Sequence, residues 1–258
     1  MLLCLDVGNT HLLGGVFDKD KLILRFRYAT FLLGTADQLG IFLVNILQYH
    51  NLNFSKIKAV ALSSVVPNYN YTLKHCFGQY FKTAVYFLLQ SGVKTGLNIC
   101  CKNPSEVGAD RIANAIAAVA TFPNEPLIVV DMGTATTLCV ITEKRDYLGG
   151  AILPGMRLCM EALKNNTAKL MAVDIEVPDC YMGKTTRESI QSGLYYGHFG
   201  ALKEIISGFK KEVFEKKTIK VIGTGGFAQL YEGKGLFDFL VPDLALLGLK
   251  KAFEYNKK

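Results

Sequence analysis

Residues 2–18 read Leu-Leu-Cys-Leu-Asp-Val-Gly-Asn-Thr-His-Leu-Leu-Gly-Gly-Val-Phe-Asp. The apolar run 2–7 predicts a buried strand with one carboxylate, Asp6, near its end, and the run 12–17 predicts a second strand. The turn 8–10 between them is rich in backbone N–H and hydroxyl donors, and its glycine allows close approach of phosphate. A carboxylate beside such a turn suits a magnesium–phosphate site. A plain hairpin, in which Asp and Asn are only turn formers, fits the stretch equally well.

A similar plan begins again half a chain later. Residues 127–130 form another apolar run, followed by Asp131-Met-Gly-Thr-Ala-Thr-Thr. Residues 2–28 and 127–152 both predict a strand, an Asp-x-Gly turn, a second strand, a charged turn and a third strand. A single Asp-x-Gly turn means little, whereas two at equivalent places indicate a duplicated β-β-β unit with two phosphate loops.

The bulk composition predicts a folded protein, and the predicted strands and helices together indicate an α/β fold. The chain has 258 residues, of which 50% are hydrophobic and 20% charged, so it can bury a sizeable core in one large or two modest domains. We expect the division to fall between residues 1–121 and 122–258. The seven cysteines include no C-x-x-C pair and the four histidines are scattered, which argues against a zinc site. Reduced thiols in a cytoplasmic protein are expected, and no apolar run is long enough to predict a membrane span.

The net charge of +7 does not by itself predict a nucleic-acid binder. Much of it lies in short runs such as Lys210-Lys211, which are typical of a solvated helix face. The aromatic residues of the predicted helix 68–81 favour core packing over a base-stacking surface. We therefore expect no nucleic-acid partner.

A second informative stretch reads Asn-Pro-Ser-Glu-Val-Gly-Ala-Asp-Arg from Asn103. The pattern predicts a helix with Asn103 as N-cap and Pro104 at its first position. Gly108, Asp110 and Arg111 then lie near the start of an Ala-rich helix. The aspartate and arginine could form an acid and an anion clamp, or the carboxylate could simply stabilise the helix dipole.

Two glycine-containing motifs are similar to known nucleotide-binding motifs but do not meet all of their requirements. Residues 183–186, Gly-Lys-Thr-Thr, are not a P-loop, because Pro178 stands where that motif requires glycine. Residues 223–228, Gly-Thr-Gly-Gly-Phe-Ala, match a dinucleotide fingerprint, but too little chain follows for a Rossmann sheet. A strand end lying against a nucleotide base or ribose suits them better. Glycines within the predicted helix 186–208 indicate close packing or a partner interface: Gly193, Gly197 and Gly200.

These motifs occur in the order seen in type III pantothenate kinases, and the chain resembles that family over nearly its whole length. The resemblance rests on Asp6-Val-Gly-Asn-Thr10, Ser64-Val-Val-Pro67, Glu106-Val-Gly-Ala-Asp-Arg111, Asp131-Met-Gly-Thr-Ala-Thr136, Gly149-Gly-Ala-Ile-Leu-Pro-Gly155 and Gly223-Thr-Gly-Gly226. It implies the fold of the acetate and sugar kinase, Hsp70 and actin superfamily. That fold has duplicated ribonuclease H-like domains, each a mixed five-stranded sheet flanked by helices, with a nucleotide cleft between them.

The resemblance also implies an activity. Such an enzyme transfers the γ-phosphoryl group of ATP to the primary hydroxyl of pantothenate, the first step of coenzyme A synthesis. The cofactors would be Mg²⁺ and a monovalent cation, K⁺ or NH₄⁺. A cytoplasmic homodimer is implied, with the active site near the dimer interface.

Site residues follow by position from the same resemblance. Asp110 would be the general base, Asp131 would bind the monovalent cation, and Asp6 would bind the divalent metal through phosphate or water. Pantothenate would be bound by Cys101, Gly108, Ala109, Asp110, Arg111 and, in its own or the neighbouring subunit, Thr186. ATP would be bound by Asp6, Val7, Gly8, Asn9, Thr10, His11, Leu12, Leu13, Thr134, Gly225 and Gly226.

Three residues depart from the family pattern. Cys101 replaces a tyrosine that lines the pantothenate pocket, and Lys102 stands where an acidic residue is frequent. Leu13 stands where some relatives carry a lysine, so phosphate binding would depend more on backbone and metal. The departure at Cys101 leaves open a kinase of another small hydroxyl compound. A catalytically silent regulatory relative is the other alternative, although its three key aspartates are all present.

Overall fold

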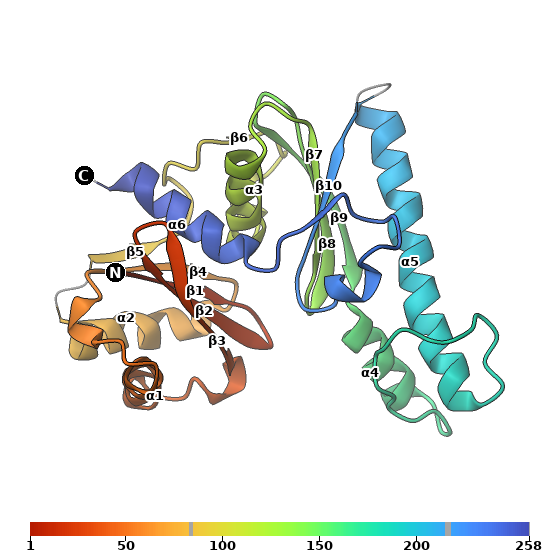
Figure 1. Cartoon of the computed structure of the whole chain (residues 1–258), viewed down its shortest axis with the longest axis horizontal. Coiled ribbons are helices and arrows are strands. Elements are labelled where there is room, and N and C mark those ends of the chain that lie inside the picture. Colours follow the sequence, from red (N-terminus) through yellow and green to blue (C-terminus); the bar gives the residue numbers. More distant parts are fainter. Residues whose placement is uncertain (83–84, 215–217, 258) are drawn as a thin grey trace. The chain divides into compact units, whose positions relative to one another are not determined.

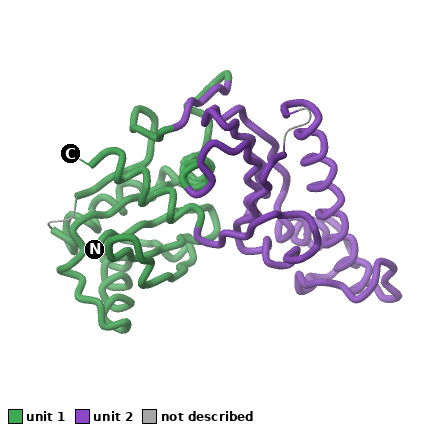
Figure 2. Tube along the Cα trace, turned by 45° about the horizontal axis from the view of Figure 1, so that its top comes forward, with its two compact units in different colours: residues 1–96, 102–120, 244–258 green, residues 97–101, 121–243 purple. Residues whose placement is uncertain are grey.

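The computed structural model describes residues 1–82, 85–214 and 218–257. The chain forms two compact units, coloured separately in Figure 2. Unit 1 comprises Met1–Gly96, Lys102–Ala120 and Leu244–Lys258, and unit 2 comprises Leu97–Cys101 and Thr121–Asp243. The units therefore differ from the expected division at 121/122 by two exchanged segments, 97–101 and 244–258.

Unit 1 is built on a five-stranded sheet in the order β3-β2-β1-β4-β5 (Figure 1). Its strands are β1 (Leu2–Val7), β2 (His11–Asp18), β3 (Lys21–Ala29), β4 (Ala59–Ser64) and β5 (Val85–Leu88). Its α-helices are α1 (Ala36–Tyr49), α2 (Asn70–Tyr80), α3 (Ala109–Thr121) and α6 (Leu244–Asn256). The first three strands are antiparallel, and β4 and β5 run parallel to β1.

Side-chain alternation along β1 divides unit 1 into layers. Leu3, Leu5 and Val7 are buried in one apolar cluster with the inner residues of α1 and α2. Leu2, Cys4 and Asp6 point to the opposite face, where α6 packs on the sheet (Figure 1). Asp6 and α6 therefore share one face of the sheet.

Unit 2 is built on a six-stranded sheet in the order β11-β10-β7-β8-β9-β6. Its strands are β6 (Asn98–Ile99), β7 (Leu127–Met132), β8 (Ala135–Ile141), β9 (Asp146–Pro154), β10 (Lys220–Thr224) and β11 (Phe239–Leu240). Its α-helices are α4 (Met156–Asn166) and α5 (Thr186–Val213), and α5 packs on the sheet through Ile190, Leu194, Leu202 and Ile206. A capping box formed by Thr185 and Glu188 starts α5.

The duplicated plan is confirmed by the strand orders. Unit 1 reads β3-β2-β1-β4-β5, and five strands of unit 2 read β9-β8-β7-β10-β11 with the same directions. The prediction of two five-stranded sheets is wrong for unit 2, because the two-residue strand β6 adds to the outer edge of β9.

The helix predicted from Asn103 starts later than expected. Pro104–Glu106 is only a 3₁₀ turn, and the Asn103 amide donates to Glu106 Oε1 at 2.8 Å instead of capping a helix. The α-helix begins at Ala109, after Gly108, whose carbonyl accepts from the Ile112 N–H at 3.1 Å. The sequence of residues 83–88 also predicts a strand; its start at Thr83 lies outside the described residues, and β5 is described from Val85.

Across the described residues, no helix combines the length and the hydropathy that crossing a membrane requires.

Candidate active site

The first Asp-x-Gly turn, in unit 1, is held from two sides. The Gly8 N–H donates to the His11 carbonyl at 3.1 Å and closes the turn. The buried Thr30 donates its hydroxyl to the Gly8 carbonyl at 2.7 Å, and its N–H donates to the Thr10 carbonyl at 2.9 Å. The carbonyls of Gly8 and Thr10 thus accept hydrogen bonds from Thr30, a residue outside the turn. These bonds hold the loop in one conformation without a ligand.

Asp6 lies at the carboxyl end of β1 beside the parallel strand β4. Register places it opposite Ser63, and the buried Ser63 hydroxyl donates a hydrogen bond to Asp6 Oδ1. A charge-assisted bond of this kind fixes the carboxylate rotamer. Sequence reasoning missed both Ser63 and Thr30; the nearest signal was that Ser63 immediately precedes the Ser64-Val-Val-Pro67 motif.

The predicted ATP-binding residues of this loop differ in how far they are buried. Val7 and Leu12 are fully buried in the apolar core, so only their backbone groups could contact a nucleotide. Asn9 and His11 are exposed, and Gly8 is half-buried. The turn itself, rather than the strand side chains, is the part able to touch phosphate.

Asp110 lies in the first turn of α3, on the same unit. Its Oδ1 accepts a hydrogen bond from the Arg111 N–H at 2.7 Å. Burial raises the pKa of the Asp110 carboxyl, and the Arg111 hydrogen bond and charge oppose that rise without cancelling it. A carboxyl whose pKa moves toward neutrality is a better general base than an ordinary aspartate.

Gly108 places Asp110 near the first loop. A Cβ at Gly108 would lie 2.4 Å from Asp110 Oδ1 and 3.5 Å from Val65 Cγ1, so glycine leaves the space that the carboxylate occupies. Val65 directly follows β4, and its N–H donates to the Val7 carbonyl at 3.1 Å. The start of α3 therefore lies at the carboxyl ends of β1 and β4, the same edge of the sheet as the Asp6 turn.

The second Asp-x-Gly turn, in unit 2, is one residue shorter. The Gly133 N–H donates to the Ala135 carbonyl at 3.1 Å, and the Gly155 N–H donates to the Thr134 carbonyl at 3.1 Å. A Cβ at Gly155 would lie 2.3 Å from the Thr134 carbonyl oxygen, so only glycine lets β9 end so close to the turn. Thr134 is thereby held in a fixed turn next to Asp131.

The glycine motif after β10 lies against Asp131. Gly225 has a φ of +90°, and a Cβ there would lie 2.5 Å from Asp131 Oδ1 and 2.6 Å from the Met132 backbone. The Phe227 N–H donates to the Met132 carbonyl at 3.2 Å. Asp131, Thr134 and Gly225 are thus gathered at the carboxyl ends of β7 and β10.

The carboxylates of Asp6 and Asp131 suit cations that are bound by only a few protein ligands. In the described part of the chain, no group of three or more His, Cys, Asp or Glu side chains could form a metal cage. Mg²⁺ in kinases keeps several waters and is usually bound by one or two carboxylates together with substrate phosphates. Asp6 and Asp131 are single, half-buried carboxylates beside turns, which suits that kind of coordination.

The predicted pantothenate residues are divided between the units. Gly108, Ala109, Asp110 and Arg111 belong to unit 1, whereas Cys101 and Thr186 belong to unit 2. Cys101 is half-buried, and its Sγ would be 3.8 Å from a Cβ at Gly149. Thr186 is exposed at the first position of α5.

Comparison with solved structures identifies the fold. The chain matches a Sinorhizobium meliloti protein provisionally described as a 2-dehydro-3-deoxygalactonokinase with a TM-score of 0.60 and 12% identity, over 98% of this chain and 95% of that one. The fold is that of actin-like ATPases and sugar kinases, with an Asp-x-Gly turn in each unit.

Comparison of sequences defines the family. The model of the family "Type III pantothenate kinase" matches residues 2–208. A type III pantothenate kinase of Legionella pneumophila is 53% identical over 99% of both chains. Type III pantothenate kinase 1 of Francisella tularensis is 46% identical over 100% of both. The chain belongs to the type III pantothenate kinase family.

Proposed function

We propose that the chain transfers the γ-phosphoryl group of ATP to the primary hydroxyl of pantothenate, giving 4′-phosphopantothenate for coenzyme A synthesis. Family membership supports the substrate. The single observation that carries the mechanism is the placement of Asp110 beside the first phosphate loop, at one edge of the unit 1 sheet. A carboxylate there can take the proton of a hydroxyl that attacks a phosphate bound by the turn.

Each proposed role follows from a contact. The turn 8–10 presents backbone donors to phosphate, and Ser63 keeps the Asp6 carboxylate directed at the metal or its waters. Arg111, next to Asp110, provides a cation for the pantothenate carboxylate. Thr134, Gly225 and Gly226 contact the nucleotide, and Asp131 binds K⁺ or NH₄⁺. When bound, Mg²⁺ and the monovalent cation neutralise the charge that builds up on the transferring phosphoryl group.

A coupled ATPase assay with pantothenate tests this proposal. We expect 4′-phosphopantothenate to form with ATP, Mg²⁺ and K⁺, and the rate to fall when K⁺ is replaced by Na⁺. Asp131→Asn should weaken K⁺ binding, so the K⁺ concentration needed for half-maximal rate should change more than the rate at saturating K⁺. A panel of small hydroxyl acids in place of pantothenate checks the substrate, because Cys101 stands at a substrate-lining position. Absence of product with both K⁺ and NH₄⁺ would overturn the proposal.

We further propose a homodimer formed through unit 2. Three glycines on α5, Gly193, Gly197 and Gly200, are exposed, and a Cβ on any of them would meet no atom within 4 Å. They therefore do not serve close packing within the described chain. Apolar side chains elsewhere on unit 2 are also exposed, namely Ile152, Met171, Tyr181 and Met182.

Light scattering after size exclusion tests the dimer. Gly197→Glu should give a monomer, whereas Gly78→Glu, on the exposed side of α2 and equally open, should leave the mass unchanged. A natural chain that elutes as a monomer would contradict the proposal. We also propose a cytoplasmic location, where thiols stay reduced; in the described chain the seven cysteines form no disulfide.

A further inference from the structure

Unit 1 contains a cavity of about 800 Å³ at the opposite end of its sheet from the phosphate loop. It lies on the α6 face, where the first residues of three parallel strands, Leu2, Ala59 and Val85, form its floor. Asp6 lies on the same face but four residues further along β1, about 13 Å away at the usual rise per residue. The cavity is therefore separate from the Asp6 and Asp110 site.

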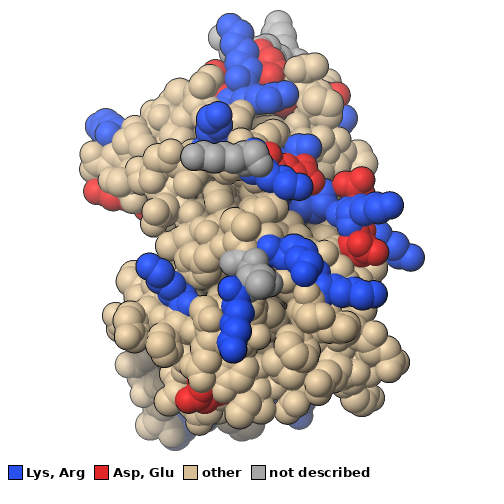
Figure 3. All heavy atoms as spheres, turned by 90° about the vertical axis from the view of Figure 1, so that its left-hand side faces the viewer, with Lys and Arg blue, Asp and Glu red and all other residues tan. Residues whose placement is uncertain are grey.

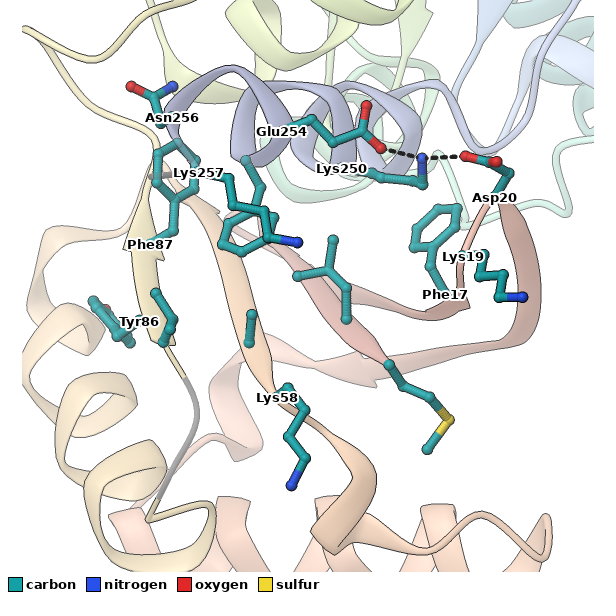
Figure 4. Close-up of a pocket in the computed structure, with 15 residues that line it drawn as sticks. Phe17, Lys19, Asp20, Lys58, Tyr86, Phe87, Lys250, Glu254, Asn256 and Lys257 are labelled. Atoms are coloured by element: carbon teal, nitrogen blue, oxygen red, sulfur yellow. Dashed lines mark hydrogen bonds and ion pairs between the residues drawn. The ribbon is translucent and has the colours of Figure 1, made fainter.

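The way α6 packs accounts for the cavity. In the first half of the helix, Leu246 fits against Gly15 of β2, and Gly248 fits against the backbone of α3 at Ala113. The second half packs more loosely, with Phe253 half-buried and Glu254 exposed. The space between that half and the strand starts is the cavity (Figure 4).

Apolar side chains line the interior. Phe87 and Phe253 meet edge to face, with ring centroids 5.9 Å apart, and Phe17 of β2 closes the far side. Val85, the first residue of the edge strand β5, is 59% exposed and adds apolar surface to the cavity. A ligand that covered this surface would gain free energy from removing it from water.

Lysines surround the apolar interior (Figure 4). Lys250 is already neutralised, because it forms ion pairs with Asp20 at 2.9 Å and with Glu254. Lys19, Lys58 and Lys257 form no ion pair with a carboxylate within the described part of the chain, although the Lys58 ammonium donates one hydrogen bond to the Ser55 carbonyl at 3.1 Å. Lysines at a helix end can simply complement its dipole, but Lys19 and Lys58 come from strand ends and have no such role.

The apolar lining of the cavity and the lysines at its edge together indicate the kind of ligand that it would bind. Lys and Arg side chains are prominent on the face drawn in Figure 3, with Asp and Glu side chains beside some of them. We propose that this cavity binds a small organic anion with an apolar body, of the class of medium-chain carboxylates. Its hydrocarbon chain lies against Phe87, Phe253 and Val85, and its carboxylate is bound by Lys257 and by Lys58, whose ammonium first leaves the Ser55 carbonyl to which it donates at 3.1 Å. The size of the cavity is in the range of small-molecule sites.

The absence of tryptophan from the chain makes a clean test possible. Phe87→Trp places the single tryptophan of the protein in the cavity, and decanoate is the probe. We expect a saturable change in tryptophan fluorescence. Lys58→Glu/Lys257→Glu in the same background should weaken decanoate binding about tenfold or more, because two cations become anions. Lys74→Glu, an exposed lysine on α2, is the matched control and should leave the affinity unchanged.

Three further ligands distinguish a specific anion site from general hydrophobic adsorption and from the nucleotide site. Decanol and decyltrimethylammonium should bind more weakly than decanoate, and ATP should not displace decanoate. Isothermal titration calorimetry on the natural chain gives the same comparison if Phe87→Trp does not fold. No saturable binding of decanoate, equal binding to the lysine double variant, or displacement by ATP would each overturn the proposal.

Discussion

The Ser63 hydroxyl donates a hydrogen bond to the Asp6 carboxylate across the parallel pair β1–β4. The two residues are 57 positions apart in the chain. One strand thus supplies the charged group of the phosphate loop, and its neighbour fixes the direction of that group. This contact makes Ser63 a positioning residue for the proposed metal and phosphate site.

Ser63→Ala should lower kcat/KM for MgATP by about 10- to 100-fold, because a hydrogen bond to a charged group is worth about 1.5–3 kcal/mol. The KM for MgATP should rise more than the KM for pantothenate, since the role proposed for Asp6 is on the nucleotide side. Ser189→Ala, an exposed serine on α5, is the control. Unchanged kinetics for MgATP would show that Asp6 needs no support from β4.

Asp110→Asn should reduce kcat by at least about 10²-fold, the lower range for loss of a general base. The same variant should be as stable as the natural chain at pH 7 or more stable. Burial raises the pKa of Asp110 in the folded state, so its ionised form is less favourable there than in the unfolded chain. Asparagine removes that cost and can still accept from the Arg111 N–H. Thermal unfolding at pH 7 is the measurement; a large loss of stability would mean that the charge itself supports the fold.

The pH profile of kcat/KM should fall on its acid side at a higher pH than an ordinary aspartate would give. The base is active only when ionised, and the pKa of Asp110 is raised. Since the Arg111 charge lowers that pKa, Arg111→Gln should move the acid limb further up in pH. Arg157→Gln, an exposed arginine on α4, should leave the limb in place. An acid limb that does not respond to Arg111 would assign the titration to another group.

Gly225→Ala should raise the KM for ATP and destabilise unit 2. Two costs combine, a positive φ and a Cβ only 2.5 Å from Asp131 Oδ1. Gly233→Ala separates them, because Gly233 also has a positive φ, of +68°, but nothing lies within 4 Å of its Cβ position. The control should lose only about 1–2 kcal/mol of stability from strain and keep its KM. Equal effects in a urea titration and in the ATP kinetics would show that the contact with Asp131 is unimportant.

Local patterns predicted much of this molecule. The two Asp-x-Gly turns and the antiparallel strands around them follow from short-range rules, and all are present. The prediction of Asn103 as N-cap is wrong although the residue pattern was correct. The Asn103 amide donates to Glu106 instead, and the first hydrogen bond of the α-helix is accepted by the Gly108 carbonyl. Capping rules identify residues able to cap, not the partner that they choose.

The contacts missed from sequence are long-range ones. Thr30 binds Gly8 from 22 residues away, and Ser63 binds Asp6 only because β4 pairs with β1. The exchange of the segments 97–101 and 244–258 between the units is also invisible in a linear pattern. Each depends on tertiary pairing, which residue spacing does not encode.

The position of α6 has a consequence for how the protein is made. The helix completes the layer over Leu2 and Cys4, yet all 123 residues of the segment Thr121–Asp243 are translated before it. One face of the first sheet therefore stays uncovered on the ribosome while the whole of that segment is being synthesised. Unit 1 begins folding first and finishes last, because its sheet is not covered on this face until α6 has been synthesised.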